Sequence, residues 1–278
     1  MNTLKITKDL LNINELKANK SYGQNFLVND EILSKIAETA DIDNTDLIIE
    51  IGPGLGNLTE YLKETNLMLI EIDDKMINIL KNRFNEIYIL NKDILKINID
   101  EEIEKLENSK NVKFNKVKVV ANLPYYITSP ILFKIFEESN RISEIIVMVQ
   151  KEVADRITSK DKSVLSYITE YFGKSETKII VKPENFIPAP KVNSAVVQIN
   201  RYDKYKDTNY LEFKELVHKS FASRRKKLIN SLVISGYKGL DKTKIEEVLI
   251  KLNIDIMVRA ENLTIDDYIN MVKEFSKY

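Results

Sequence analysis

The sequence predicts a doubly wound α/β sheet followed by a small all-helical domain. Apolar, strand-like runs alternate with segments of helical periodicity from residue 46 to residue 200, and no strand pattern follows residue 202. Such alternation is typical of a mostly parallel sheet with helices on both faces. The polar stretch 202–209 is interpreted as a linker. The expected parts are a polar, loosely tied N-terminal arm (1–20), the α/β domain (21–203) and the helical domain (204–278).

The composition excludes several kinds of site. The chain of 278 residues has no cysteine and a single histidine, so disulfides, thiolate metal sites and cysteine nucleophiles are excluded, and no metal centre is expected. No apolar run is long enough to span a bilayer, so we expect a cytoplasmic protein without a membrane partner. Its 42 basic residues balance 42 acidic residues. Any nucleic-acid binding must therefore come from a local basic patch.

An aromatic residue, Phe26, lies shortly before the first predicted helix. Asn29 and Asp30 are candidate caps, and apolar residues recur at helical spacing from Ile32 to Ala40. Phe26 and Leu27 precede the caps. From local sequence alone, they would staple the start of this helix onto the core.

A glycine-rich turn follows the first predicted strand. The strand Leu47–Ile51 runs into Gly52-Pro53-Gly54-Leu55-Gly56, and a helix is expected from Asn57. Glycines let a backbone turn tightly and approach a ligand closely. A second strand, Leu67–Ile72, carries Glu71 at 19 residues after Gly52, which is the spacing expected for a carboxylate that binds a ribose hydroxyl pair.

Nicotinamide and adenosylmethionine sites share this layout, and two details favour adenosylmethionine. The dinucleotide fingerprint has glycine at its sixth position, where this chain has Asn57. The pattern Glu-x-Gly-x-Gly-x-Gly, here Glu50 to Gly56, is instead typical of the start of adenosylmethionine-dependent methyltransferases. The predicted fold is therefore a Rossmann-like methyltransferase sheet.

The third predicted strand ends near a second carboxylate. A helix over Asp74–Phe84 and a strand over Ile87–Leu90 lead to Asp93. Asp93 could accept a hydrogen bond from an adenine amino group, or it could cap the helical turn that follows. Local sequence leaves both interpretations open.

The motif Asn122-Leu123-Pro124-Tyr125-Tyr126 ends the fourth predicted strand, Val117–Ala121. Proline favours extended geometry at Leu123, whose carbonyl can then point away from the sheet. Asn122 adds a side-chain acceptor, and Tyr125 offers a ring for stacking. These groups could hold a planar amino-purine by its exocyclic nitrogen. A plain strand-to-loop turn is the alternative.

A proline-rich loop provides a further aromatic candidate. Phe186-Ile187-Pro188-Ala189-Pro190-Lys191-Val192 could hold Phe186 over the sheet edge on the side of Tyr125, or Phe186 could belong to the core. The other elements expected around it are helices at 129–138, 151–157 and 163–172 and strands at 145–150, 176–181 and 194–201.

The helical domain contains one cationic stretch. Residues 219–230 have no acidic residue. Such a stretch could contact phosphates, although a solvated helix face is the alternative. The candidate RNA-binding residues are Arg224, Arg225, Lys226 and Lys227.

Taken together, the chain resembles the small-subunit ribosomal RNA adenine N6,N6-dimethyltransferases, which modify two adjacent adenosines of bacterial 16S rRNA. The resemblance runs from about residue 20 to residue 275. Five motifs carry it in order: Gly23-Gln24-Asn25-Phe26-Leu27, Glu50 to Gly56, Asn122 to Tyr126, Phe186-x-Pro-x-Pro-Lys-Val and Phe221-x-x-Arg-Arg-Lys-x-Leu-x-Asn.

The resemblance implies roles for individual residues. Asn122, Leu123 and Tyr125, with Phe186 stacking, would hold the target base. It further implies a 16S rRNA partner, within the small subunit or its precursor, and a monomer. One departure is the loop 157–162, which is shorter than in the family. The cofactor-binding set for adenosylmethionine would be Asn25, Leu27, Gly52, Gly54, Glu71, Asp93 and Asn122.

Two competing functions remain open on the sequence. One is the related 23S rRNA adenine N6-methyltransferase of the macrolide-resistance type. The other is a non-catalytic ribosome-assembly factor on the same fold. The tail motif and the Asn-Leu-Pro-Tyr-Tyr loop favour the small-subunit enzyme over the first, and the intact glycine turn with Glu71 argues against the second.

Overall fold

The computed structural model describes residues 1–16 and 24–278, which divide into two compact units. The sheet unit comprises residues 1–154 and 175–201, and the helical unit comprises residues 155–174 and 202–278. The helical unit thus includes 155–174, a segment that we expected within the α/β domain. The expected boundary at residue 20 and Gly23 of the first motif lie outside the described residues.

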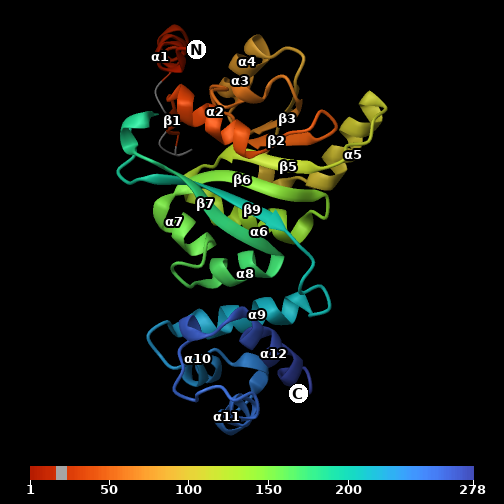
Figure 1. Cartoon of the computed structure of the whole chain (residues 1–278), viewed down its shortest axis with the longest axis vertical. Coiled ribbons are helices and arrows are strands. Elements are labelled where there is room, and N and C mark those ends of the chain that lie inside the picture. Colours follow the sequence, from red (N-terminus) through yellow and green to blue (C-terminus); the bar gives the residue numbers. More distant parts are fainter. Residues whose placement is uncertain (17–23) are drawn as a thin grey trace. The chain divides into compact units, whose positions relative to one another are not determined.

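The sheet unit is built on a seven-stranded sheet of order β4-β3-β2-β5-β6-β9-β7 (Figure 1). Strands β4, β3, β2, β5 and β6 pair in parallel, and β9 pairs antiparallel to β6. The strands are β2 (Leu47–Ile51), β3 (Asn66–Glu71), β4 (Tyr88–Asn91), β5 (Val117–Asn122), β6 (Ile142–Gln150), β7 (Gly173–Val181) and β9 (Ser194–Arg201). A separate antiparallel pair joins β1 (Phe26–Leu27) to β8 (Phe186–Ile187).

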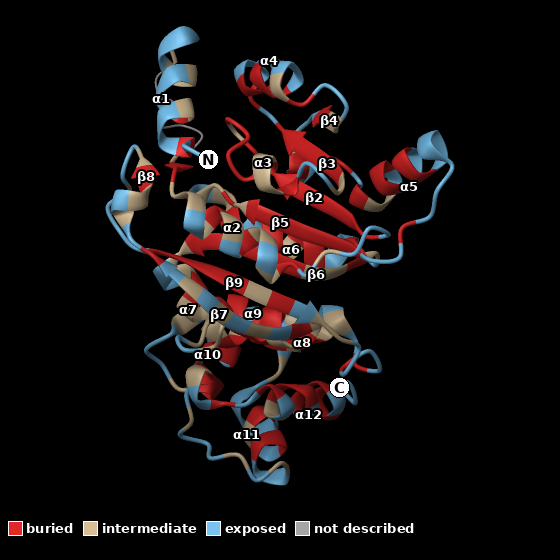
Figure 2. Ribbon diagram, turned by 45° about the horizontal axis from the view of Figure 1, so that its top comes forward, coloured by how far each residue is buried: buried red, intermediate tan, exposed pale blue. Residues whose placement is uncertain are grey.

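Both faces of the sheet are buried, which explains why the sequences of the central strands are continuous apolar runs. Every residue of β2 is buried, and Figure 2 shows β2, β3 and β5 buried along most of their length. One face packs against α2 and α4 through residues such as Ile36 and Leu80. Residues of alternating position, such as Ile49, face the opposite side and are equally buried. A parallel sheet needs such cover on both faces.

Helices connect the strands, and their starts follow local capping. The Asn29 side chain accepts from the backbone N–H of Glu31 and of Ile32 at the start of α2, as its position suggested. The helix expected from Asn57 is short and starts at Thr59. The helical elements are α2 (Asp30–Thr39), α3 (Thr59–Leu62), α4 (Asp74–Arg83), η2 (Ile94–Lys96), α5 (Ile99–Lys110), η3 (Tyr125–Ile127), α6 (Thr128–Glu138), α7 (Lys151–Ile157) and η4 (Pro183–Asn185).

The N-terminal segment is not the loosely tied arm that its polar composition suggested. Residues Thr3–Ile13 form helix α1, which is part of the sheet unit. Thr7 is fully buried, and Leu10 and Leu11 pack against the cluster that contains Phe26 and Leu55. Amphipathic spacing of few apolar residues is sufficient to bury one face of a helix. The helix has few apolar residues, and the residues that they contact lie far away in the sequence.

The helical unit has a core of aromatic residues. Tyr167, Phe213 and Tyr268 are fully buried, and the Tyr167 and Tyr268 ring centroids are 4.6 Å apart. The Tyr167 hydroxyl donates to the Leu263 carbonyl at 2.6 Å, so its polar tip is satisfied. The elements are α8 (Val164–Phe172), α9 (Tyr210–Ser220), η5 (Phe221–Ser223), α10 (Leu228–Ile234), η6 (Tyr237–Gly239), α11 (Lys242–Lys251), η7 (Ala260–Asn262) and α12 (Ile265–Phe275).

Two features are absent from residues 1–16 and 24–278. No helix there has both the length and the apolar composition that crossing a bilayer requires. No group of three or more histidine or acidic side chains is arranged to hold a metal ion.

The glycine turn yields a stability prediction. Gly56 has φ +79°, and a Cβ atom there would lie 2.5 Å from the Phe84 ring, whereas one at Gly52, with φ +66°, would have no neighbour closer than 3.6 Å. Both Gly→Ala variants strain the backbone, by about 1–2 kcal/mol. Only Gly56→Ala adds overpacking, of about 1–3 kcal/mol. Denaturant unfolding should therefore find Gly56→Ala the less stable variant, and equal losses would contradict this packing.

Candidate active site

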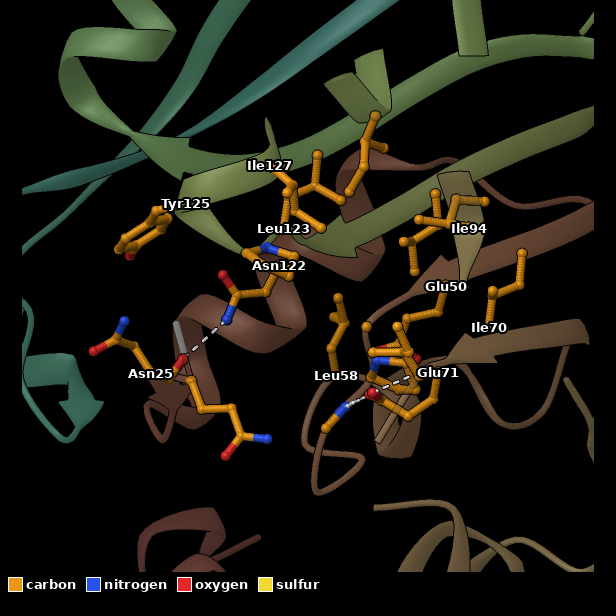
Figure 3. Close-up of a pocket in the computed structure, with 18 of the residues that line it drawn as sticks. Asn25, Glu50, Leu58, Ile70, Glu71, Ile94, Asn122, Leu123, Tyr125 and Ile127 are labelled. Carbon is orange, nitrogen blue, oxygen red and sulfur yellow. Dashed lines mark hydrogen bonds between the residues drawn. The ribbon is translucent and has the colours of Figure 1, made fainter. Parts of the chain in front are cut away.

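A cavity lies at the carboxyl ends of β2, β3 and β5, the edge where open α/β sheets bind ligands (Figure 3). Residues of β1 and of the loops after β4 and β5 complete its wall. The structure thereby brings together all predicted cofactor residues and three of the four predicted base-binding residues. Those lining the cavity are Asn25, Leu27, Gly52, Gly54, Glu71, Asp93, Asn122, Leu123 and Tyr125.

Glu71 lines the cavity, and its carboxylate binds backbone N–H groups of two neighbouring segments. One carboxylate oxygen accepts from the Gly54 N–H at 3.0 Å, and the other accepts from the Ile72 and Asp73 N–H groups at 2.9 Å each. Burial raises the pKa of this carboxyl, and the three backbone donors oppose that rise. A carboxylate has about four acceptor positions, so Glu71 retains capacity for a ligand hydroxyl.

The glycine turn is positioned by this carboxylate. The left-handed φ of +56° at Gly54 aims its N–H at Glu71, and a side chain there would crowd the Phe26 ring at 3.1 Å. The turn also approaches the β5 loop, because a Cβ atom at Gly52 would lie 3.6 Å from the Pro124 ring. The backbone can therefore line the cavity where side chains would fill it.

Asp93 has the local role that its sequence allowed, and it lines the cavity as well. One oxygen accepts from the Leu95 N–H at 3.0 Å and so caps η2. The other lies 3.7 Å from the Lys96 ammonium. The side chain is half-buried and is part of the cavity wall. Capping and ligand binding are compatible because a carboxylate accepts several hydrogen bonds.

Asn122 and Leu123, at the end of β5, both line the cavity. The Asn122 amide nitrogen donates to the Asn25 carbonyl at 3.2 Å, which turns the amide oxygen to the other side, toward Tyr125 in Figure 3. The Leu123 N–H donates to the Met148 carbonyl at 3.1 Å. Within residues 1–16 and 24–278 no donor reaches the Leu123 carbonyl.

Tyr125 is fixed through its hydroxyl. The hydroxyl lies 2.6 Å from the Ser194 hydroxyl at the start of β9, and burial raises the pKa of Tyr125. Because the polar tip is held, the ring is available as a rigid stacking surface. The neighbouring Tyr126 is 55% exposed and also lines the cavity.

Phe186 does not lie over the sheet edge, and that prediction was wrong. Its side chain is 3% exposed and belongs to the core cluster that includes Leu27 and Val196. The cause is the pairing of β8 with β1, in which Phe186 faces Leu27 across the ladder. It is not among the described residues that line the cavity. The alternative of a core phenylalanine is the correct one.

Comparisons with known proteins agree with this geometry. A family model described as ribosomal RNA adenine dimethylase matches residues 15–277. The chain belongs to the ribosomal RNA adenine dimethylase family. A relative named ribosomal RNA small subunit methyltransferase A, from Fusobacterium nucleatum, is 42% identical over 94% of this chain and 98% of its own. Another protein with this name, from Alkaliphilus oremlandii, is 39% identical over 95% of this chain and 94% of its own.

Solved structures share the fold. A dimethyladenosine transferase from Plasmodium falciparum is 28% identical, with a TM-score of 0.74 over 91% of this chain and 98% of that chain. The 23S rRNA methyltransferase ErmE has a TM-score of 0.66 over 91% of this chain and 100% of that chain. At 21% identity, ErmE shows the shared fold alone. The Rossmann-like methyltransferase fold predicted from the sequence is therefore confirmed.

The family's cofactor is S-adenosylmethionine, and the cavity of this rRNA dimethylase suits it. The cofactor carries hydroxyl, amino and ammonium donors, and Glu71, Asp93 and the Asn122 oxygen are acceptors on the wall. The apolar side chains of Ile72 and Ile94 lie among these acceptors and can pack against an adenine ring. The chemistry of the wall thus fits the cofactor's polar edge and its flat apolar base.

Glu50, near the end of β2, lines the cavity but was not among the predicted site residues. It is 2% exposed, and one oxygen accepts from the Thr59 hydroxyl at 2.7 Å. Burial raises the pKa of Glu50 to about 8, so the carboxyl is protonated at neutral pH. The sequence did mark this residue, because Glu50 is the first position of the Glu50–Gly56 motif. The motif does not indicate that the carboxyl is buried.

The basic stretch forms a turn and not a helix face. Residues 221–223 form η5, and α10 starts only at Leu228. A groove in the helical unit is lined by three of the four candidate RNA-binding residues and gains two cations from distant sequence. Arg224 is not part of it, because it lies 3.6 Å from Asp161 and donates to the Lys162 carbonyl. The cations that line the groove are Arg225, Lys226, Lys227, Lys242 and Arg259.

The raised pKa of Glu50 yields a prediction for stability against pH. The folded-state pKa of about 8 lies above the ordinary value of 4.5, so the folded state binds the extra proton between these values. Stability contributed by the neutral carboxyl is present below about pH 4.5 and is lost as the pH rises through 8. Glu50→Gln should remove this decline, measured as the free energy of unfolding at several pH values. Parallel pH profiles of variant and wild type would contradict it.

Proposed function

We propose that this protein transfers methyl groups from S-adenosylmethionine to the N6 amino groups of two adjacent adenosines in 16S rRNA of the small ribosomal subunit. The single observation that carries the proposal is the place of Asn122 and Leu123 in the cavity wall at the end of β5, beside the fixed Tyr125 ring. Membership of the rRNA adenine dimethylase family supports it.

The acceptor pair suits the chemistry of an adenine amino group. Its nitrogen is a poor nucleophile because its lone pair is delocalised into the ring. Acceptors at Asn122 and Leu123 would bind the two N–H hydrogens and favour a pyramidal nitrogen with a free lone pair. The bound cofactor supplies an electrophilic methyl group on a sulfonium. The protein contributes mainly by holding the nitrogen in line with that methyl group.

The target adenosine must leave its stack to reach this site. Enzymes that modify a base extrude it into a pocket and support its face with aromatic side chains. Tyr125 offers a ring that its Ser194 hydrogen bond holds in place. Phe186 is in the core, and the exposed Tyr126 is a second aromatic side chain of the β5 loop that lines the cavity.

The groove in the helical unit is proposed to contact rRNA phosphates. Its cations come from three segments, and none of the described residues that line it is acidic. Lys242 lies 3.4 Å from Glu246 and Arg259 lies 3.9 Å from Glu261, so Arg225, Lys226 and Lys227 are the cations best placed to attract phosphates and release counterions on binding. We further propose that the protein acts as a monomer in the cytoplasm, on the small subunit or its precursor, where its methylation is coupled to ribosome assembly.

Loss of the side-chain acceptor tests the proposed chemistry. Asn122→Ala should lower kcat at least about 100-fold, by analogy with removing a transition-state hydrogen-bond partner. Cofactor affinity should fall by no more than about tenfold, because one neutral hydrogen bond contributes about 0.5–1.5 kcal/mol. The assay is transfer of labelled methyl groups to under-methylated small subunits, beside calorimetric cofactor binding.

A matched control is Asn200→Ala, since Asn200 is exposed on β9 and is not among the described cavity-lining residues. It should leave kcat unchanged. Wild-type turnover of the Asn122→Ala variant would refute the acceptor role.

The salt dependence of RNA binding tests the groove. Arg225→Gln should reduce the slope of log K against log salt by about 0.7–0.9, the value for one phosphate contact. Lys251→Gln is the control in the same unit, because its ammonium lies 2.6 Å from Glu274 and its charge is already paired. Binding is measured by fluorescence anisotropy with a 16S rRNA fragment. An unchanged slope for Arg225→Gln would mean that the groove is merely solvated.

A further inference from the structure

Asn57, directly after the glycine turn, joins three parts of the sheet unit. Its amide nitrogen donates to the Leu27 carbonyl at 2.8 Å and to the Thr7 hydroxyl of α1 at 2.9 Å. The side chain is 7% exposed and lines the cofactor cavity, as Leu27 does. An amide nitrogen has two hydrogens, so both are used. This residue occupies the position at which a dinucleotide-binding turn would have glycine.

The other atom of the amide has no partner. Within residues 1–16 and 24–278 no donor reaches the buried Oδ1 of Asn57. An amide flip would place the oxygen against the Leu27 carbonyl, which is also an acceptor, so the bond to Leu27 fixes the orientation. A buried acceptor without a donor offsets much of what two neutral hydrogen bonds contribute to stability. Asn57 therefore adds little net stability, and its fixed geometry requires another explanation.

That explanation is the orientation of the Leu27 carbonyl. A carbonyl oxygen has two lone pairs, and Asn57 occupies one. The β1–β8 ladder pairs Leu27 with Phe186, and the Val28 N–H donates to the Asn185 carbonyl at 2.8 Å, so the strand backbone is held on the β8 side. The Asn57 amide restrains the Leu27 carbonyl from the glycine-turn side, and its bond to Thr7 stops the amide from rotating away.

We propose that Asn57 is a positioning residue for S-adenosylmethionine, which holds the Leu27 carbonyl so that it accepts a hydrogen bond from the cofactor's α-ammonium group. Two other strong acceptors of the cavity suit other donors of the cofactor. Glu71 suits the ribose hydroxyls and Asp93 suits the adenine amino group, at the ends of β3 and β4. The Leu27 carbonyl, which the Asn57 amide orients, is the acceptor on the β1 side that we assign to the ammonium group.

Two ligands separate this role from a general structural one. S-adenosylhomocysteine carries the α-ammonium, whereas 5′-methylthioadenosine has the same adenosine and sulfur but no amino-acid part. Asn57→Ala should weaken binding of S-adenosylhomocysteine about tenfold, equivalent to about 1.4 kcal/mol. Binding of 5′-methylthioadenosine should not change. Both are measured by isothermal titration calorimetry on the full chain, and unaltered binding of 5′-methylthioadenosine also shows that the cavity is folded.

A second variant grades the effect. Thr7→Val keeps the shape of the side chain on α1 and removes its hydroxyl. Asn57 then keeps its hydrogen bond to the Leu27 carbonyl but loses its hydrogen bond to residue 7. It should weaken S-adenosylhomocysteine binding by a smaller factor, about two- to threefold, again without effect on 5′-methylthioadenosine. Equal losses for both ligands, or no loss for either, would overturn the proposal.

The inference rests on the cofactor and not on the proposed RNA substrate. These titrations contain no RNA, so their failure would leave methyl transfer to 16S rRNA untouched. A failure to methylate 16S rRNA would, conversely, leave the titrations valid.

Discussion

The buried carboxylate of Glu71 is the interaction on which the rest of the site depends. Moving a charged carboxylate out of water costs several kcal/mol, and native proteins accept this only where hydrogen bonds compensate it. Here three backbone N–H groups do so, and they come from the turn after β2 and from the residues after β3. The carboxylate thereby ties two strand ends together. It sets the path of the glycine turn and so the floor of the cavity.

The same sheet edge then determines what the rest of the cavity can bind. Parallel strands end at one edge, so the loop after β5 lies beside the turn after β2, where Gly52 approaches Pro124. The proline cannot donate a hydrogen bond, and Asn25 holds the Asn122 amide with its oxygen directed away. Asn122 and Leu123 therefore lie in the wall of the cofactor cavity, and no donor from the described part of the chain reaches the Asn122 oxygen or the Leu123 carbonyl. An amino group that carries two hydrogens is their natural complement.

The sequence predicted what depends on neighbouring residues and missed what depends on distant contacts. The strand-turn-helix at Gly52 and the β5 loop were found because their spacing is local, and the structure brings both to one cavity. Phe186 was misplaced because its burial depends on pairing with Leu27, far away in the chain. For the same reason α1 was taken for a loose arm. Arg259 was missed because only the folded helical unit brings it to the basic groove.

The most direct test of the account is the identity of the modified nucleoside and of the RNA that carries it. Purified protein and S-adenosylmethionine are incubated with under-methylated small subunits and, separately, with 23S rRNA, and the digested RNA is analysed by mass spectrometry. The account predicts N6,N6-dimethyladenosine at two adjacent positions of 16S rRNA and none in 23S rRNA. Modified adenosine in 23S rRNA alone, or cofactor binding without methyl transfer to either RNA, would contradict it.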